Sequence, residues 1–238
     1  MKRLVKLAAI TAAFALPTMA SAQDKVEATV GADIVSHYVW RGQNMAHASV
    51  QPTLGVAWKG LSLTAWGDYS FMESTDNKEL DFTLAYSTGG FTIGITDYWV
   101  GSLSDKFYKY GSDDCHVFEA NVGYDFGILS INWYTNFAGN VGYTKTGKKS
   151  YGSYFELAAP FRLGGLDWNA ALGFVPFATS CYDADKGGVG AFALTNVSLK
   201  ATKELKITDS FSLPLYANVI ANPHAGKCYF VLGASIGL

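Results

Sequence analysis

The dominant pattern in the chain is an alternation of apolar and polar residues with a period of two. In residues 61–71 the odd positions are mostly apolar or aromatic and the even positions mostly polar, and residues 79–88, 116–125 and 166–175 repeat the pattern. Such alternation predicts β-strands with one apolar and one polar face. We predict twelve strands, over residues 26–42, 49–58, 61–71, 79–88, 91–100, 116–125, 129–138, 151–161, 166–175, 191–204, 211–222 and 228–238.

The connections between these strands alternate in length. Even-numbered strands are followed by short turns such as Lys59-Gly60 and Gly89-Gly90, whereas most odd-numbered strands are followed by longer segments, reaching about fifteen residues at 101–115. Short periplasmic turns alternating with long extracellular loops are typical of outer-membrane barrels. The sequence therefore predicts an all-β, up-and-down antiparallel transmembrane barrel of about 12 strands, with both termini periplasmic.

The first residues have the features of a secretory signal. Lys2, Arg3 and Lys6 precede a short apolar run from Leu7 to Leu16, and the small residues Ala20-Ser21-Ala22 form a cleavage site. The apolar run is too short to cross a bilayer as a helix. We therefore expect residues 1–22 to be a cleaved signal peptide and residues 23–238 to form one barrel domain in the cell outer membrane.

Composition narrows the function classes. The 238 residues are 49% hydrophobic, 15% aromatic and only 16% charged, with a net charge of −2. This balance excludes a disordered chain and argues against a nucleic-acid partner. A secreted, soluble β-sandwich or lipocalin-like barrel also alternates. The alternating connection lengths argue against it, and so does a last strand with Phe230, Leu232, Ala234, Ile236 and Leu238 on one face.

Several stretches resemble a known family. Ser36-His37-Tyr38-Val39-Trp40-Arg41-Gly42, followed by Gln51-Pro52, is similar to the start of the TorF-type porins. Thr96-Asp97-Tyr98-Trp99 and residues 201–215 resemble later stretches of related outer-membrane proteins. The resemblance implies an outer-membrane barrel and, for the family, a transport role.

The polar faces of the strands supply candidate pore-lining residues, among which acids outnumber bases: Asp33, His37, Arg41, Asp68, Asp81, Glu119, Glu156 and Lys200. Charged linings select counter-ions, so a conducting lumen would prefer cations. The competing interpretation is that the interior acids pair with Arg41, Arg162 or Lys200 across the lumen and hold the barrel shut. Asp33, His37 and Arg41 recur at four-residue steps on one face of the first predicted strand, which predicts a constriction there.

Large aromatic residues lie near the ends of the predicted strands, among them Tyr38, Trp40 and Tyr98. We interpret them as part of an interfacial girdle, which flanks the apolar band of membrane barrels.

The long loops carry the cysteines. We predict Cys181–Cys228 as the first disulfide pairing, because their loops are neighbours and the cell exterior is oxidising; Cys115 is then left over. Asp113, Asp114, Cys115 and His116, together with His224, are ligand types that suit zinc. Their spacing matches no standard motif, so a polar loop is the better interpretation, and no cofactor is expected.

Two functions remain open. The first is a porin-like channel for passive diffusion of small solutes, with a preference for cations. The second is a non-conducting barrel that serves as a structural or accessory subunit among other outer-membrane proteins. Both need the lipid bilayer of the outer membrane as a partner. No histidine lies in a nucleophile signature such as Gly-x-Ser-x-Gly, so we expect no enzymatic activity.

Overall fold

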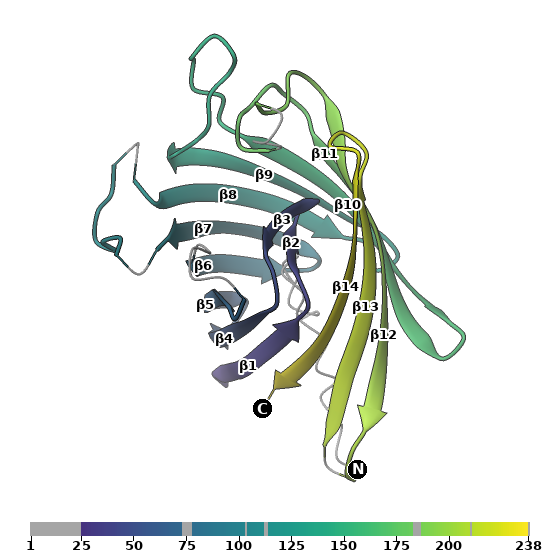
Figure 1. Cartoon of the computed structure of the whole chain (residues 1–238). Coiled ribbons are helices and arrows are strands. Elements are labelled where there is room, and N and C mark those ends of the chain that lie inside the picture. The colour runs from purple at the N-terminus through teal and green to yellow at the C-terminus, as the bar shows by residue number, and fades with distance from the viewer. Residues whose placement is uncertain are drawn as a thin grey trace.

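The structure, a computed structural model, describes residues 25–72, 78–102, 104–111, 114–182, 187–209 and 211–237. Within these residues twelve antiparallel strands form one closed barrel in the order β1-β14-β13-β12-β11-β10-β9-β8-β7-β6-β5-β4 (Figure 1). The predicted all-β, up-and-down barrel of about 12 strands is confirmed. No helix in the described ranges is long and apolar enough to cross a membrane. The predicted signal peptide lies outside the described residues.

The barrel strands are close to the predicted spans with one exception. They are β1 (Glu27–Val35), β4 (Ser49–Trp58), β5 (Leu61–Ser70), β6 (Lys78–Thr88), β7 (Phe91–Gly101), β8 (His116–Asp125), β9 (Ser130–Gly139), β10 (Ser153–Leu163), β11 (Leu166–Val175), β12 (Ala193–Lys206), β13 (Ser212–Asn222) and β14 (Lys227–Gly237). The first strand closes the barrel, because Asp33 is paired with Gln51 of β4 on one side and with Ser235 of β14 on the other.

The two ends of the barrel differ. At the end where β1 begins, which we call the turn end, the strands are joined by tight turns. Lys59 and Gly60 there have φ angles of 49° and 86°, and Gly89 and Gly90 have 55° and 88°. Positive φ at both central residues is the mark of a type I′ hairpin turn, whose twist matches that of the strands. The opposite end, the loop end, carries the longer connections, except that residues 223–226 form a short turn between β13 and β14.

The outer wall of the barrel is apolar. Large hydrophobic side chains at alternate positions are exposed on it, including Leu63, Leu84, Ile95, Val122, Leu172, Leu199, Val219 and Leu232. The neighbouring positions point inward and are mostly polar and buried, among them Thr96, Asn121 and Asn132. A soluble barrel has the reverse arrangement, with its apolar side chains inside. An apolar outside around a polar inside is typical of a barrel that lies in lipid.

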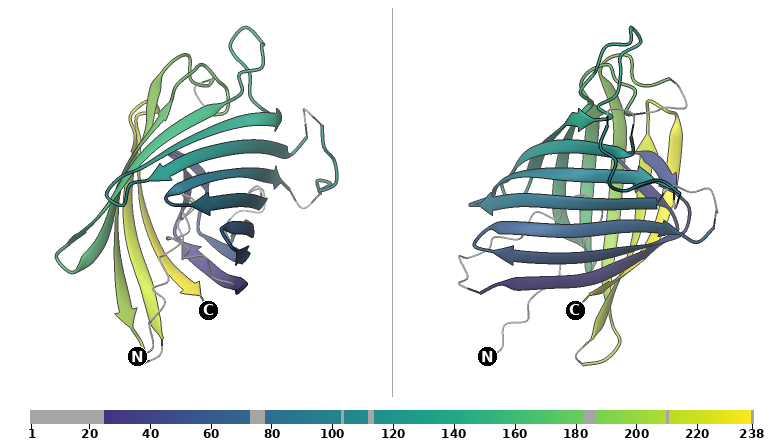
Figure 2. Two further views of the ribbon diagram at one scale, coloured as in Figure 1. Left: turned by 180° about the vertical axis from the view of Figure 1, so that it is seen from behind. Right: turned by 90° about the vertical axis from the view of Figure 1, so that its left-hand side faces the viewer.

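The exception is the first predicted strand, which is wrong beyond Val35. There the chain leaves the wall and forms a hairpin of β2 (Tyr38–Trp40) and β3 (Gln43–Ala46), which lies inside the barrel (Figures 1 and 2). The physical reason is the turn: Arg41 and Gly42 have φ angles of 50° and 82°, so the chain reverses between them. We call residues 36–48 the inner hairpin.

A charge on the outer wall tests whether this wall contacts lipid. Leu84 is 51% exposed and lies between Leu63 and Ile95 of the neighbouring strands. We expect Leu84→Arg to destabilise the barrel folded in lipid vesicles, lowering its free energy of unfolding by about 2–4 kcal/mol, because lipid solvates the guanidinium poorly. The measurement is a urea titration followed by tryptophan fluorescence.

The matched control is Tyr108→Arg, in a loop where the native side chain is 89% exposed. This control is expected to stay within about 0.5 kcal/mol of the wild type, as is usual for surface substitutions. Equal effects of the two substitutions would contradict a lipid-facing wall.

Candidate functional site in the barrel lumen

The tip of the inner hairpin touches the barrel wall at β12 and β13. The Gly42 carbonyl accepts a hydrogen bond from Asn222 Nδ2 at 3.1 Å. A Cβ atom at Gly42 would lie 1.9 Å from the carbonyl oxygen of Thr195. Glycine is therefore required at position 42 for two reasons, its positive φ and this close approach. Since the inner hairpin connects β1 to β4, it extends through the lumen from those two strands to β12 and β13.

Arg41, beside the tip, binds the far wall through an ion pair. Its Nη1 and Nη2 atoms donate to Glu119 Oε2 and Oε1 of β8 at 2.7 and 2.8 Å. Nη1 also donates to the hydroxyl of Tyr182, in the loop between β11 and β12, at 2.8 Å. The side chains of Arg41 and Glu119 are only 7% and 1% exposed. A bidentate pair of this kind fixes orientation as well as distance.

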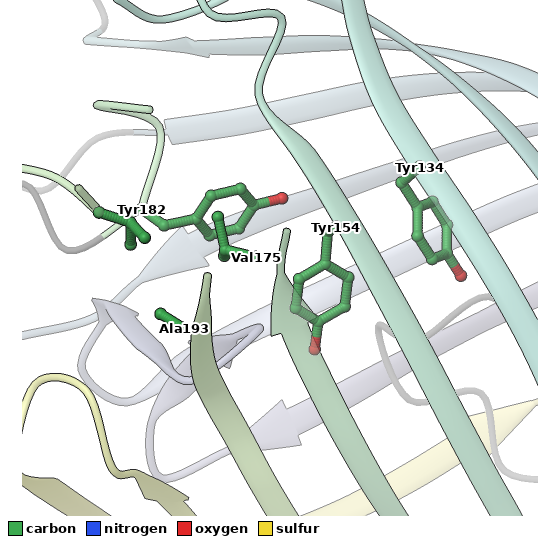
Figure 3. Packing of buried hydrophobic residues seen from close by; sticks show 6 residues of the cluster. Tyr134, Tyr154, Val175, Tyr182 and Ala193 are labelled. Carbon is green, nitrogen blue, oxygen red and sulfur yellow. The ribbon is translucent and has the colours of Figure 1, made fainter. Parts of the chain in front are cut away.

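Aromatic rings enclose the guanidinium. Its central carbon lies 4.3, 4.2 and 4.6 Å from the ring centroids of Trp40, Tyr134 and Tyr154. The ring of Tyr182 stacks on Tyr154 at a centroid distance of 5.7 Å, and Figure 3 shows Tyr134 and Tyr154 on neighbouring strands with Tyr182 on the loop beside them. Burial raises the pKa of Tyr182, which keeps its phenol neutral. Tyr98 also donates to Glu119 Oε1, at 2.9 Å. We call Arg41, Glu119 and these five aromatic residues the arginine cage.

Acidic side chains line a different part of the wall, on β5 and β6. Asp68 accepts hydrogen bonds from Ser49 Oγ at 2.6 Å and from Gln51 Nε2 at 2.8 Å. Asp81 is 8% exposed, and its Oδ1 atom has no hydrogen-bond partner. In the part of the chain that the structure describes, neither Asp81 nor Glu79 forms an ion pair. We call Asp68, Glu79 and Asp81 the acidic wall.

The remaining predicted site residues are spread around the lumen. Asp33 lies on an inward position of β1, and Lys200 of β12 places its Nζ 3.9 Å from the ring centroid of Tyr216. Glu156 of β10 accepts a hydrogen bond from the Tyr154 hydroxyl at 3.2 Å. His37 precedes β2, and its ring centroid is 5.6 Å from that of His47 across the base of the hairpin.

The expectation that Asp33, His37 and Arg41 share one strand face is therefore wrong. Only Asp33 lies on the barrel wall, because β1 ends at Val35. The structure brings Arg41 to Glu119 instead, 78 positions away.

Exposure inside the barrel changes along its length. Arg162 and Asp167, near the turn end, form an ion pair whose side chains are 72% and 52% exposed. Those of Arg41 and Glu119 are almost fully buried. The exposed pair lies beside the β10–β11 turn, and the side chains pack tightly at the level of the inner hairpin tip.

Sequence reasoning misplaced three aromatic residues of the lumen, two of which belong to the arginine cage. Tyr38, Trp40 and Tyr98 were expected at the membrane interface, but Tyr38 and Tyr98 are only 4% and 8% exposed, and Trp40 packs on Tyr98 and Tyr182. The expected girdle is thus wrong for these three residues, because two belong to the inner hairpin and Tyr98 points inward. The available signal was the Arg41-Gly42 pair, since a glycine after a polar residue is a common hairpin turn.

The predicted loop sites do not form. Cys181 and Cys228 are not bonded. The reason is position: Cys181 Sγ accepts a hydrogen bond from Asn136 Nδ2 at 3.5 Å and contacts Gly142 and Gly152, whereas Cys228 lies on β14.

The residues considered for zinc have other roles where they are described. His116 Nδ1 lies 2.7 Å from Asp97 Oδ1, and its Nε2 lies 2.5 Å from the Phe107 carbonyl oxygen. Burial raises the pKa of the neighbouring Cys115 thiol. Among the described residues no three His, Cys, Asp or Glu side chains form a group that could hold a metal ion, and Asp113 lies outside those residues.

Comparisons with known proteins add several distant structural similarities. No protein-family model and no curated protein matches the chain. An outer-membrane channel from Pseudomonas putida F1 aligns with a TM-score of 0.41 and 13% identity, over 88% of this chain and 94% of that one. OmpF from Salmonella typhi aligns with a TM-score of 0.38 and 9% identity, over 90% and 98%. The outer-membrane protein OpdK from Pseudomonas aeruginosa aligns with a TM-score of 0.38 and 11% identity, over 90% and 66%. At these values the similarities assign no function to this chain.

The close contact between the hairpin tip and β12 can be tested at Gly42. We expect Gly42→Ala to lower the free energy of unfolding by about 3 kcal/mol, because the new methyl group meets the Thr195 carbonyl and the backbone is left-handed. The measurement is chemical unfolding in detergent micelles.

The matched control is Gly89→Ala. Gly89 has a φ of 55° but nothing within 4 Å of the added carbon, so only the backbone strain of about 1 kcal/mol is expected. If both variants lose the same stability, the tip does not sit against β12.

Proposed function

We propose that the protein is an outer-membrane channel of porin type that lets small solutes diffuse passively and prefers cations. In this proposal the turn end and both termini are periplasmic, the loop end is extracellular, and the chain is related to the TorF-type porins. The apolar outer wall and polar interior support a membrane barrel. Twelve strands enclose more room than the eight whose interior side chains just fill, and the inner hairpin narrows that room.

The single observation that carries the cation preference is the division of charge in the lumen. The arginine of the inner hairpin is paired with Glu119, so it does not face a passing solute as a free positive charge. Glu79 and Asp81 of the acidic wall have no such partner among the described residues. A narrow passage lined by net negative charge concentrates cations and repels anions.

A second candidate is the non-conducting barrel, which acts as a structural or accessory subunit. The observation that favours it is the packing at the hairpin tip, where Tyr154 and Tyr182 have no exposed surface and Glu119 is 1% exposed. If side chains also fill the rest of the cross-section, no ion passes.

Planar-bilayer conductance under a salt gradient separates the two candidates. For protein expressed from the full sequence and purified from membranes, we expect steady channels with a reversal potential biased toward cations. The double variant Glu79→Gln, Asp81→Asn is expected to lower the cation-to-anion permeability ratio severalfold, because it removes the unpaired charges of the acidic wall.

The control is Asp209→Asn, since Asp209 is fully exposed at the turn end and pairs with Lys206. This variant should keep the wild-type permeability ratio. A correctly folded, heat-modifiable barrel that shows no conductance would contradict the channel function and favour the accessory subunit.

A further inference from the structure

The connection between β9 and β10 forms a small hairpin of its own, residues 141–152, which stands beyond the ends of these strands (Figure 1). Thr144 N donates to the Lys148 carbonyl at 2.8 Å, and Gly147 N donates to the Thr144 carbonyl at 2.9 Å. Tyr143 and Lys149 form an antiparallel bridge. Residues 141–152 therefore have a defined backbone, and we call them the lysine hairpin.

The base of the lysine hairpin is fixed to the neighbouring loop between β11 and β12. Tyr143 N donates to Ser180 Oγ at 2.9 Å, and the hydroxyls of Ser150 and Thr179 lie 2.7 Å apart. Cys181 Sγ contacts the base where two glycines leave room for it. The position of the hairpin relative to the barrel is thus set by several contacts.

The charge of this hairpin is not paired with that of any other described residue. Its charged residues are Lys145, Lys148 and Lys149, and residues 140–152 contain no acid. All three lysines are exposed, and none forms an ion pair with another described residue. By contrast, Lys109 in the loop before β8 pairs with Asp114. Three like charges in five residues repel one another, and a bound anion would relieve that repulsion.

An aromatic cluster covers the outer wall beside this hairpin. Trp133 of β9 and Phe155 of β10 have ring centroids 6.1 Å apart, and Trp133 is 6.3 Å from Phe177. Phe177 and Phe192 are 59% and 66% exposed. Exposed aromatic rings on a membrane barrel gather where the hydrocarbon region meets the head groups. The lysines beyond these rings therefore stand at the level of lipid head groups.

We propose that the lysine hairpin binds the phosphate groups of lipids in the membrane leaflet at the loop end. The lysine ammonium groups supply donors to phosphate oxygens, and the aromatic cluster contacts the acyl chains just below. Free inorganic phosphate shares the head-group chemistry, but it offers nothing to the exposed rings. The proposal rests on the membrane location given above, and it does not depend on whether the barrel conducts.

The experiment measures binding of lipid A, a phosphorylated glycolipid, to the purified full-length protein in neutral detergent micelles, by tryptophan fluorescence and native mass spectrometry. The test variant is the triple substitution Lys145→Gln, Lys148→Gln, Lys149→Gln. Since each lysine near an anionic surface contributes about 1 kcal/mol, we expect an affinity loss on the order of 100-fold. The matched control removes three lysines at or near the turn end, with Lys59→Gln, Lys203→Gln and Lys206→Gln, and should bind like the wild type.

Each outcome decides a separate point. Equal lipid A binding by the wild type and both triple variants overturns the proposal. Inorganic phosphate that displaces lipid A at the same phosphate concentration also overturns it, because the ion alone would then be bound. Dephosphorylated lipid A should bind no better to the wild type than to the test variant. Both triple variants must keep heat-modifiable gel migration, which shows that the barrel is folded.

The same samples are tested for conductance. A wild-type protein that shows no conductance but binds lipid A contradicts the channel function and leaves the lipid site standing. A conducting wild type that does not bind lipid A contradicts the lipid site alone.

Discussion

The bidentate pair between Arg41 and Glu119 joins the inner hairpin to the barrel wall, and most features of the lumen depend on it. Burying two charges costs several kcal/mol per ion in lost hydration, so such a pair forms only where the geometry is good and the remaining polar atoms have partners. Here Tyr182 and Tyr98 supply those partners, and three aromatic rings face the guanidinium. Without the pair, Glu119 would be a buried carboxylate without a counter-charge, and the hairpin would be held by its tip and by the packing of Tyr38 and Trp40 on aromatic side chains of the barrel.

This pair also bears on which charged side chains of the lumen could act on a solute in the proposed channel. Arg41 of the inner hairpin is neutralised by Glu119, so the proposed channel does not present it as a free positive charge. Lys200, a second inward cation, lies over the ring of Tyr216. The proposed selectivity rests on Glu79 and Asp81, which form no ion pair with another described residue.

The barrel itself could be predicted because its rules are local. Alternation shows which residues face lipid, and turn glycines such as Gly60 and Gly90 show where strands end, so twelve strands followed from the sequence. The inner hairpin could not be found in this way, since Arg41 takes a positive φ that is uncommon outside glycine. The candidate site was predicted as single residues on strand faces. Its central contact joins positions 41 and 119, and only the closed barrel brings them together. The cysteine pairing failed for the same reason, because loop neighbourhood does not fix where a side chain points.

A double-mutant cycle on the pair is the most direct test of the central claim, which is that Arg41 and Glu119 hold the hairpin in the lumen. The variants are Arg41→Met, Glu119→Gln and both together, with the free energy of unfolding in urea measured for each in detergent micelles. The account predicts an interaction energy of about 2–3 kcal/mol, because each single change leaves a buried partner unpaired and the double change does not. Additive effects within about 0.5 kcal/mol would mean that the two side chains do not meet, and that the hairpin is not held across the lumen.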